Sequence, residues 1–296
     1  MSFVTFSHTE DEIVCGARQT DLEPRIVGGN VAPPHAWPWM AYINMLFWYD
    51  DQPKNEHYCS AVILNEQWLL TAADCVANTS TATLVIGRAT MGTNKVPKDN
   101  GKTDGLEIEF ARWDVHVNYY YNPENLDNNI ALIKLAKPIN FTGWEYSIVP
   151  ICLPNANDVK DTSNCYTTGW GAQGQNRPNS KKLLQVNQLV NEKKQCEKIF
   201  PHLNDAQLCA GNTNRTVCLN DRGGPLQCMN KYGFWWLEGI VSFVPHDCTG
   251  PGLYSRIEAY VKWINDTIER NKYPKPNPFD PTAPPPHTPP PPYSYF

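Results

Sequence analysis

Three short stretches of the chain place charged or amide side chains beside cysteine, glycine and small apolar residues. They are W-L-L-T-A-A-D-C, which contains Asp74, D-N-N-I-A-L, which contains Asn129, and C-L-N-D-R-G-G-P, which contains Arg222. A carboxylate is mostly ionised at neutral pH and is a much weaker base than imidazole. A guanidinium stays protonated and has no lone pair with which to attack a carbonyl carbon. These groups therefore lack the nucleophile and base that acyl transfer requires.

The composition indicates a globular protein that is large enough to bury a sizeable core. The chain has 296 residues, of which 41% are hydrophobic and 10 are tryptophan. Its formal net charge of −5 offers no basic surface for nucleic acid, so no nucleic-acid partner is expected.

The cysteine content predicts disulfides and an oxidising compartment. The 10 cysteines form no C-x-x-C pair and no zinc-type cluster with histidine, so disulfides are favoured over a metal site. Four sequons without proline agree with a secretory route; they begin at Asn78, Asn140, Asn214 and Asn265. The segment from Met1 to Asp11 has no basic or apolar region, so it predicts no signal peptide, and no apolar run is long enough for a membrane span.

Short apolar runs separated by Gly, Pro, Asn and Asp predict an all-β fold of the sandwich or barrel type. The runs expected to be strands are Ser60–Leu64, Gln67–Thr71, Thr83–Gly87, Ile130–Leu135 and Gly239–Ser242. Apolar residues recur at helical spacing between Ile257 and Arg270, which predicts an amphipathic helix packed on the strands.

The chain is expected to comprise an N-terminal segment (1–25), a folded domain (26–270) and a proline-rich tail (271–296). From Pro274 to Phe296 there are 11 prolines in 23 residues, which excludes a continuous helix or a central strand. Such a tail is either a spacer or a polyproline II ligand for an aromatic-lined groove.

Six ordered motifs resemble the chymotrypsin/trypsin family of serine peptidases. The three stretches above are joined by R-I-V-G-G from Arg25, T-T-G-W-G from Thr167 and G-I-V-S-F from Gly239. The resemblance runs from about Cys15 to Arg270. It implies two six-stranded antiparallel Greek-key β-barrels with a C-terminal α-helix.

The resemblance also implies that the catalytic triad is degenerate. Active members carry L-T-A-A-H-C, N-D-I-A-L and G-D-S-G-G-P in these places. Here Asp74 occupies the place of the histidine base, Asn129 that of the orienting aspartate and Arg222 that of the serine nucleophile. Asn220 replaces the oxyanion-hole glycine, and its Cβ is expected to hinder that turn. Asp74 and Arg222 are expected to form an ion pair.

The specificity pocket is expected to be neutral and partly filled. Thr216 occupies the pocket base, so no acidic group is present for a Lys or Arg side chain. In the pocket wall, valine replaces a glycine; the wall and rim residues are Ser242, Phe243, Val244 and Gly252.

Arg25–Ile26 resembles the family's activation-cleavage bond, and Asp221 matches the aspartate that receives the new N-terminal ammonium. His57 matches a histidine that partners this aspartate before cleavage. Either an activating peptidase still cleaves after Arg25, or these residues are inherited packing. The family's disulfide pattern pairs Cys15 with Cys152, Cys59 with Cys75, Cys165 with Cys228, Cys196 with Cys209 and Cys218 with Cys248.

These features predict a secreted pseudoprotease that binds or regulates a protein or glycoprotein and uses no cofactor or metal. The A-W-P-W-M stretch from Ala36 and the proline-rich tail are similar to acrosin-like members of the family, which implies a secretory granule of sperm and egg-coat glycoproteins or another acrosomal peptidase as partners. The alternatives are an active peptidase that uses Ser242 or a shifted histidine, and a decoy for inhibitors. Met45–Tyr49 is either a buried strand or an exposed contact patch.

Overall fold

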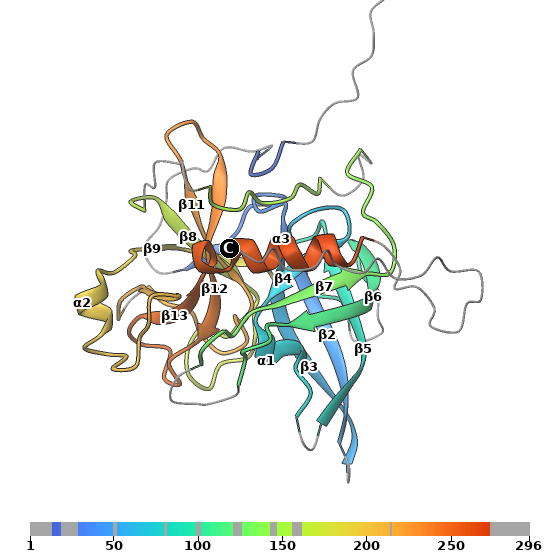
Figure 1. Cartoon of the computed structure of the whole chain (residues 1–296), viewed down its shortest axis with the longest axis horizontal. Coiled ribbons are helices and arrows are strands. Elements are labelled where there is room, and N and C mark those ends of the chain that lie inside the picture. The colour runs from blue at the N-terminus through green and yellow to red at the C-terminus, as the bar shows by residue number, and fades with distance from the viewer. Residues whose placement is uncertain are drawn as a thin grey trace, which may run out of the picture.

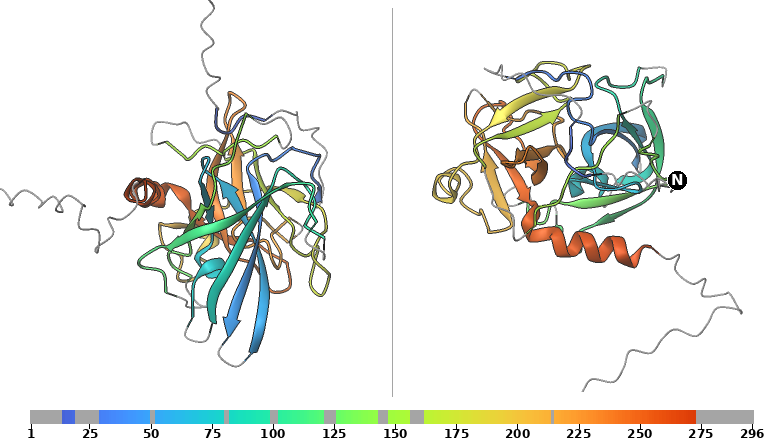
Figure 2. Two further views of the ribbon diagram at one scale, coloured as in Figure 1. Left: turned by 90° about the vertical axis from the view of Figure 1, so that its right-hand side faces the viewer. Right: turned by 90° about the horizontal axis from the view of Figure 1, so that it is seen from above.

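The computed structural model describes residues 14–18, 29–49, 52–79, 82–98, 102–120, 126–142, 147–155, 162–213 and 215–272. The predicted cleavage bond Arg25–Ile26, the sequon at Asn214 and the tail from residue 273 lie outside these residues. In the described part, two bodies built of strands lie side by side, with one long helix across them (Figure 1, Figure 2). The predicted all-β class is confirmed.

The described residues form thirteen strands and four helices. The strands are β1 (Asn30–Val31), β2 (Met40–Tyr49), β3 (Gln52–Ile63), β4 (Trp68–Thr71), β5 (Ala82–Met91), β6 (Leu106–Val115), β7 (Ala131–Leu135), β8 (Cys165–Gly169), β9 (Leu184–Gln188), β10 (Gln207–Ala210), β11 (Pro225–Met229), β12 (Trp235–Phe243) and β13 (Gly252–Arg256). The helices are α1 (Ala73–Val76), α2 (Lys193–Cys196), the 3₁₀ helix η1 (Ile257–Tyr260) and α3 (Val261–Arg270). Each predicted strand lies in or overlaps one of these strands.

The first body is a closed barrel with the strand order β2-β3-β4-β7-β6-β5. Its long strand β2 pairs with β3 on one side and with β5 on the other. Side chains alternate across the barrel wall, so Met45 and Phe47 are buried while the Trp48 side chain between Phe47 and Tyr49 is 52% exposed. Met45–Tyr49 is therefore neither a wholly buried strand nor a wholly exposed patch.

The second body is a sheet with the order β1-β9-β8-β11-β12-β13-β10. The resemblance predicts six strands, and the structure has seven because β1 pairs with the first residues of β9. The chain after β9 turns to β10 instead, through the bridge between Val190 and Ala210 and a hydrogen bond from the Asn191 N–H to the Cys209 carbonyl, 3.0 Å. These contacts bring the two ends of the second body together, so its six core strands also curve into a barrel.

Two buried tryptophans join the barrels. Trp37 Nε1 donates to Gln185 Oε1 of β9 at 2.8 Å, and Trp39 Nε1 donates to Gln227 Oε1 of β11 at 2.6 Å. The two rings also pack edge to face, with centroids 5.9 Å apart. The A-W-P-W-M stretch thus forms part of the interior between the barrels.

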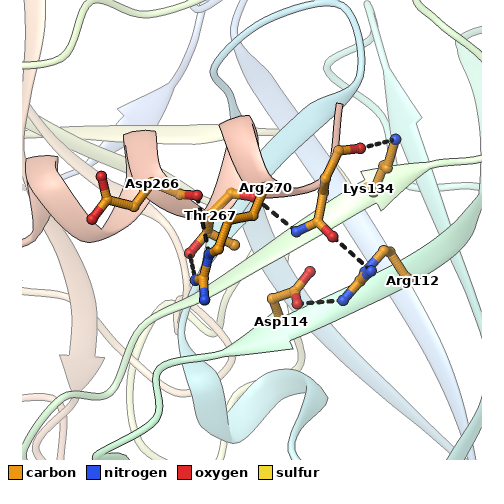
Figure 3. Close-up of polar contacts among 7 residues, drawn as sticks. Arg112, Asp114, Lys134, Asp266, Thr267 and Arg270 are labelled. Atoms are coloured by element: carbon orange, nitrogen blue, oxygen red, sulfur yellow. Dashed lines mark hydrogen bonds and ion pairs between the residues drawn. The ribbon is translucent and has the colours of Figure 1, made fainter. Parts of the chain in front are cut away.

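Helix α3 ends on the first barrel (Figure 3). Asn271, just after the helix, accepts a hydrogen bond on its side-chain oxygen from Arg112 of β6 at 2.7 Å. Its backbone carbonyl accepts one from Lys134 of β7 at 2.9 Å. The predicted helix from Ile257 to Arg270 is present as η1 followed by α3.

Replacement of Trp39 by phenylalanine should lower the free energy of unfolding by about 1–3 kcal/mol, because the Gln227 amide oxygen would be buried without a donor. The matched control is Trp48→Phe, at an exposed site, which should change it by no more than about 0.5 kcal/mol. Denaturant unfolding of both variants measures this. Equal stability of the two would contradict a structural role for the Trp39 hydrogen bond.

Candidate functional site

Asp74 and Arg222 meet in the cleft between the barrels. Asp74 lies on α1, which follows β4 of the first barrel, and Arg222 lies in the loop between β10 and β11 of the second. Arg222 Nη1 is 2.7 Å from Asp74 Oδ2, and the exposed fractions of the two side chains are 38% and 6% respectively. The ion pair expected from the sequence is therefore present, with its carboxylate buried and its guanidinium half-buried.

Asn129 connects this pair to both barrels. Its Oδ1 accepts a hydrogen bond from the Asp74 backbone N–H at 3.0 Å, and its Nδ2 donates to the Ser242 carbonyl at 3.3 Å. The Ser255 hydroxyl donates to the Asn129 carbonyl at 2.9 Å. Because Asn129 is fully buried and uncharged, it satisfies these groups without a buried charge of its own.

Burial raises the pKa of the Asp74 carboxyl above its ordinary value, and the Arg222 guanidinium only partly offsets this effect. The guanidinium is thus what keeps a carboxylate at this place tolerable at neutral pH.

Two residues of the turn that carries Arg222 lie in the left-handed region of backbone conformation. Asn220 has φ 68° and Gly223 has φ 76°. Asn220 thus adopts the left-handed region despite its Cβ, and asparagine tolerates this region better than other residues with a Cβ. Its Nδ2 donates to Asn179 Oδ1 at 2.8 Å, which ties the turn to a neighbouring loop. Gly223 is required, since a Cβ there would lie 2.1 Å from Thr71 Oγ1.

Apolar side chains fill the space beside the predicted pocket residues. Val217, which the sequence reasoning missed, is 1% exposed, and Val244 is 3% exposed. Both belong to one buried cluster with Tyr254. A Cβ on Gly252 would lie 2.4 Å from Val217 Cγ2, so a valine methyl occupies the space that this glycine leaves. A β-branched residue directly after Thr216 is the sequence signal that could have shown this.

A small open cavity remains around the ion pair, with a volume of about 180 Å³. It is lined by His57, Tyr58, Cys59, Asp74, Cys75, Leu219, Asn220, Arg222 and Val244. His57 does not pair with Asp221. Its ring hydrogen-bonds Tyr49 Oη at 2.8 Å, so the expected partnership with the aspartate is not present.

Asp221 lines a second cavity of about 400 Å³, which Thr216, the predicted pocket base, also lines. The Gly171 N–H donates to its Oδ1 and the Cys218 N–H to its Oδ2, each at 2.9 Å. Burial raises the pKa of Asp221 to about 6. Gly29, three residues after Ile26, lines the same cavity.

Comparison with known proteins assigns this arrangement to a family. The family model described as Trypsin matches residues 26–264. The chain belongs to the trypsin family. It is 31% identical over 276 residues to Transmembrane protease serine 9 of Rattus norvegicus; the match covers 89% of this chain and 23% of that protein's length. The solved structure described as "Structure of GrC" is similar with a TM-score of 0.69 and 27% identity, over 82% of this chain and 100% of that one.

All five disulfides implied by the trypsin-family resemblance are present. Cys59–Cys75 fixes α1 to β3 directly beside Asp74, and Cys218–Cys248 closes the loop that carries Asn220 and Arg222. Cys15–Cys152 ties the segment before the predicted cleavage bond to the body. Such a set is typical of trypsin-like proteins of oxidising, extracellular compartments.

Two features are absent among the residues described: a cluster of metal-ligating side chains and a membrane-spanning helix. No three His, Cys, Asp or Glu side chains among them gather as a cation site would require. None of the helices within the described ranges has the length and apolar character that crossing a bilayer needs.

Replacement of Arg222 by methionine should destabilise the protein at pH 7 by about 2 kcal/mol, because it leaves the Asp74 carboxylate buried without its cation. The raised pKa of Asp74 fixes the sign of the pH dependence. The loss of unfolding free energy grows as pH rises toward the pKa of Asp74 in the folded protein. It is absent below about pH 4, where the carboxyl is neutral in the folded and the unfolded protein. Urea unfolding at pH 7 and at pH 4 measures this difference. The control Asp74→Leu/Arg222→Met should recover most of the loss at pH 7, and an equal loss in both variants would refute this account.

Proposed function

We propose that the chain is a non-catalytic member of the trypsin family that acts by binding or regulating a protein or glycoprotein. The observation that carries this proposal is the contact between Asp74 and Arg222 at 2.7 Å. If these residues occupy the places of the base and the nucleophile, then each side chain is held by the other. Neither can supply the oxygen nucleophile or the imidazole that peptide hydrolysis needs.

The filled pocket supports the same proposal. A substrate side chain would have to displace Val217 and Val244, which are packed in a buried apolar cluster. The packing of these valines also weighs against a decoy for inhibitors, because the anchoring side chain of an inhibitor would have to displace them as well. A ligand would instead contact the cleft along its open surface.

The competing function is an active peptidase that uses other groups. Ser242 is fully buried in β12, where no substrate carbonyl can reach its hydroxyl. The His57 ring hydrogen-bonds Tyr49, and His116 packs between Tyr260 and Trp263. Ser242, His57 and His116 are thus not arranged as a working pair, so this alternative has less support.

We further propose that cleavage after Arg25 by another peptidase releases an Ile26 ammonium that pairs with Asp221. Gly29 already lines the Asp221 cavity, and three residues of extended chain span about 10 Å. An ammonium beside this carboxylate would lower its pKa and remove the cost of its burial. The binding surface around the cleft would then be ordered by cleavage, as catalysis is in active relatives.

The proposed setting is the secretory pathway, with a granule of the acrosomal type as the narrower possibility. Asn78, Asn140 and Asn265 are exposed and accessible to glycosylation. The acrosin-like likeness rests on the proline-rich tail and on the stretch that contains Trp37 and Trp39. Egg-coat glycoproteins or another acrosomal peptidase are accordingly the partners to test first.

The triad assignment is tested with the variant Asp74→His/Asn129→Asp/Arg222→Ser, after cleavage at Arg25. The cleaved native protein should not react with a fluorophosphonate, whereas the triple variant should be labelled at residue 222. Peptide hydrolysis should in addition require Val217→Ser and Val244→Gly, because the substrate side chain needs the space of these valines. Labelling of the native protein at any serine would overturn the proposal.

The state of Asp221 gives a pH signature for the uncleaved chain. A pKa raised to about 6 means that the stability contribution is complete below about pH 4 and is lost as pH rises through 6. The free energy of unfolding, taken relative to Asp221→Asn at each pH, should therefore fall by roughly 2–3 kcal/mol between pH 4 and pH 7. After cleavage this fall should disappear. A fall of the same size in cleaved and uncleaved protein would contradict pairing with Ile26.

A further inference from the structure

Three aromatic side chains line a cavity of about 250 Å³ beside the ion pair. Tyr42 of β2 and Tyr58 of β3 are stacked with ring centroids 5.7 Å apart, and Trp170 meets Tyr42 edge to face at 5.6 Å. Trp170 Nε1 donates to the Asn94 carbonyl at 2.9 Å, which fixes the orientation of the indole. We call this set of three rings the aromatic cradle.

The rim of the cradle is polar and rich in N–H donors. Asn44, Asn179, Lys181 and Asn220 line the cavity together with Pro97. Asn179 and Lys181 are exposed. A proline-rich segment has many carbonyl acceptors and few N–H donors, and its extended polyproline II form leaves those carbonyls without internal partners. Aromatic rings that contact the prolines, together with N–H donors that bind the carbonyls, are the combination that recognises such a segment.

The chain carries such a segment itself. Its residues 274–296 contain 11 prolines, and Pro289–Pro292 is followed by Tyr293. Pre-formed polyproline II loses little conformational entropy on docking, which is why aromatic-lined grooves bind it. The composition of the tail and the chemistry of the cradle are therefore complementary.

The described chain also ends on the first barrel, which carries Tyr42 and Tyr58 of the cradle. Asn271 is held by Arg112 of β6 and Lys134 of β7 (Figure 3). Around the closed barrel, β6 is followed by β5 and then by β2, which carries Tyr42. The 16 residues from Tyr273 to Thr288 span about 50 Å as polyproline II, roughly three times the radius of gyration of a folded domain of this size. The proposal requires that the path from Asn271 to the cradle lie within this length.

We propose that Pro289–Tyr293 of the same chain docks in the aromatic cradle formed by Tyr42, Tyr58 and Trp170. The cradle cavity and the cavity around Asp74 and Arg222 share Tyr58, Cys59 and Asn220 in their linings. The docking site would therefore lie at one end of the cleft. This inference does not depend on whether the cleft is catalytic.

The test uses the full chain with residue 293 replaced by p-benzoylphenylalanine, which cross-links to neighbouring atoms on irradiation. The expected product has the mass of one chain and joins residue 293 to a peptide that contains Tyr42, Tyr58 or Trp170. A product with the mass of two chains, or a cross-link only to other surfaces, would overturn docking of the chain's own tail. Absence of any cross-link would do the same.

Two variants separate a specific contact from mere proximity. Tyr58→Ser should abolish the cross-link, whereas Tyr232→Ser, at an aromatic residue that is 73% exposed on the second barrel, should leave it unchanged. In the unlabelled chain, Pro289–Pro292→Ser should raise amide hydrogen exchange in the cradle segments by about tenfold, which corresponds to about 1.4 kcal/mol of docking free energy. Unchanged exchange would contradict the proposal even if Tyr58→Ser folds poorly.

Discussion

Buried polar contacts between the barrels are the constraint on which the rest of this structure depends. Trp39 reaches Gln227, and Asn129 reaches Ser242, across the interface of the two bodies. Hydrogen bonds in such a dry interior are directional and costly to break, so they fix the position of one barrel on the other more strictly than apolar packing does. The distance between Asp74 and Arg222 follows from that position, since each barrel supplies one partner.

The ion pair itself contributes little to folding. A contact between one buried and one half-exposed charge recovers little more than the cost of desolvating the carboxylate. The pair matters because the loss of one partner leaves the charge of the other unbalanced. Without the guanidinium, the charge that remains is the buried carboxylate. The two side chains thus balance each other's charge within the cleft.

The sequence was sufficient for the features that rest on short motifs. The ion pair, all five disulfides, the strand segments and the terminal helix agree with the structure, because each is defined by residues whose partners the family pattern places. The features that the motifs did not predict have physical causes. Asn220 has φ 68°, and its side chain donates a hydrogen bond to Asn179 in a neighbouring loop. The role of Val217 depends on the space left by Gly252, some 35 residues later in the chain. The contact of His57 with Tyr49 depends on the register of β2 with β3. The seventh strand forms because β1 pairs with the first residues of β9, whereas the chain just after β9 pairs with β10.

The two ends of the cleft present different surfaces. At one end, Val217 and Val244 belong to a buried apolar cluster beside the predicted pocket residues. At the other end, the aromatic cradle forms a cavity with hydrogen-bond donors on its rim. If the chain is non-catalytic, as proposed, recognition of an extended backbone would replace recognition of a single side chain. Such recognition requires a rigid groove and not a reactive centre, and the disulfide Cys59–Cys75, which joins the strand that carries Tyr58 to the helix that carries Asp74, supplies that rigidity.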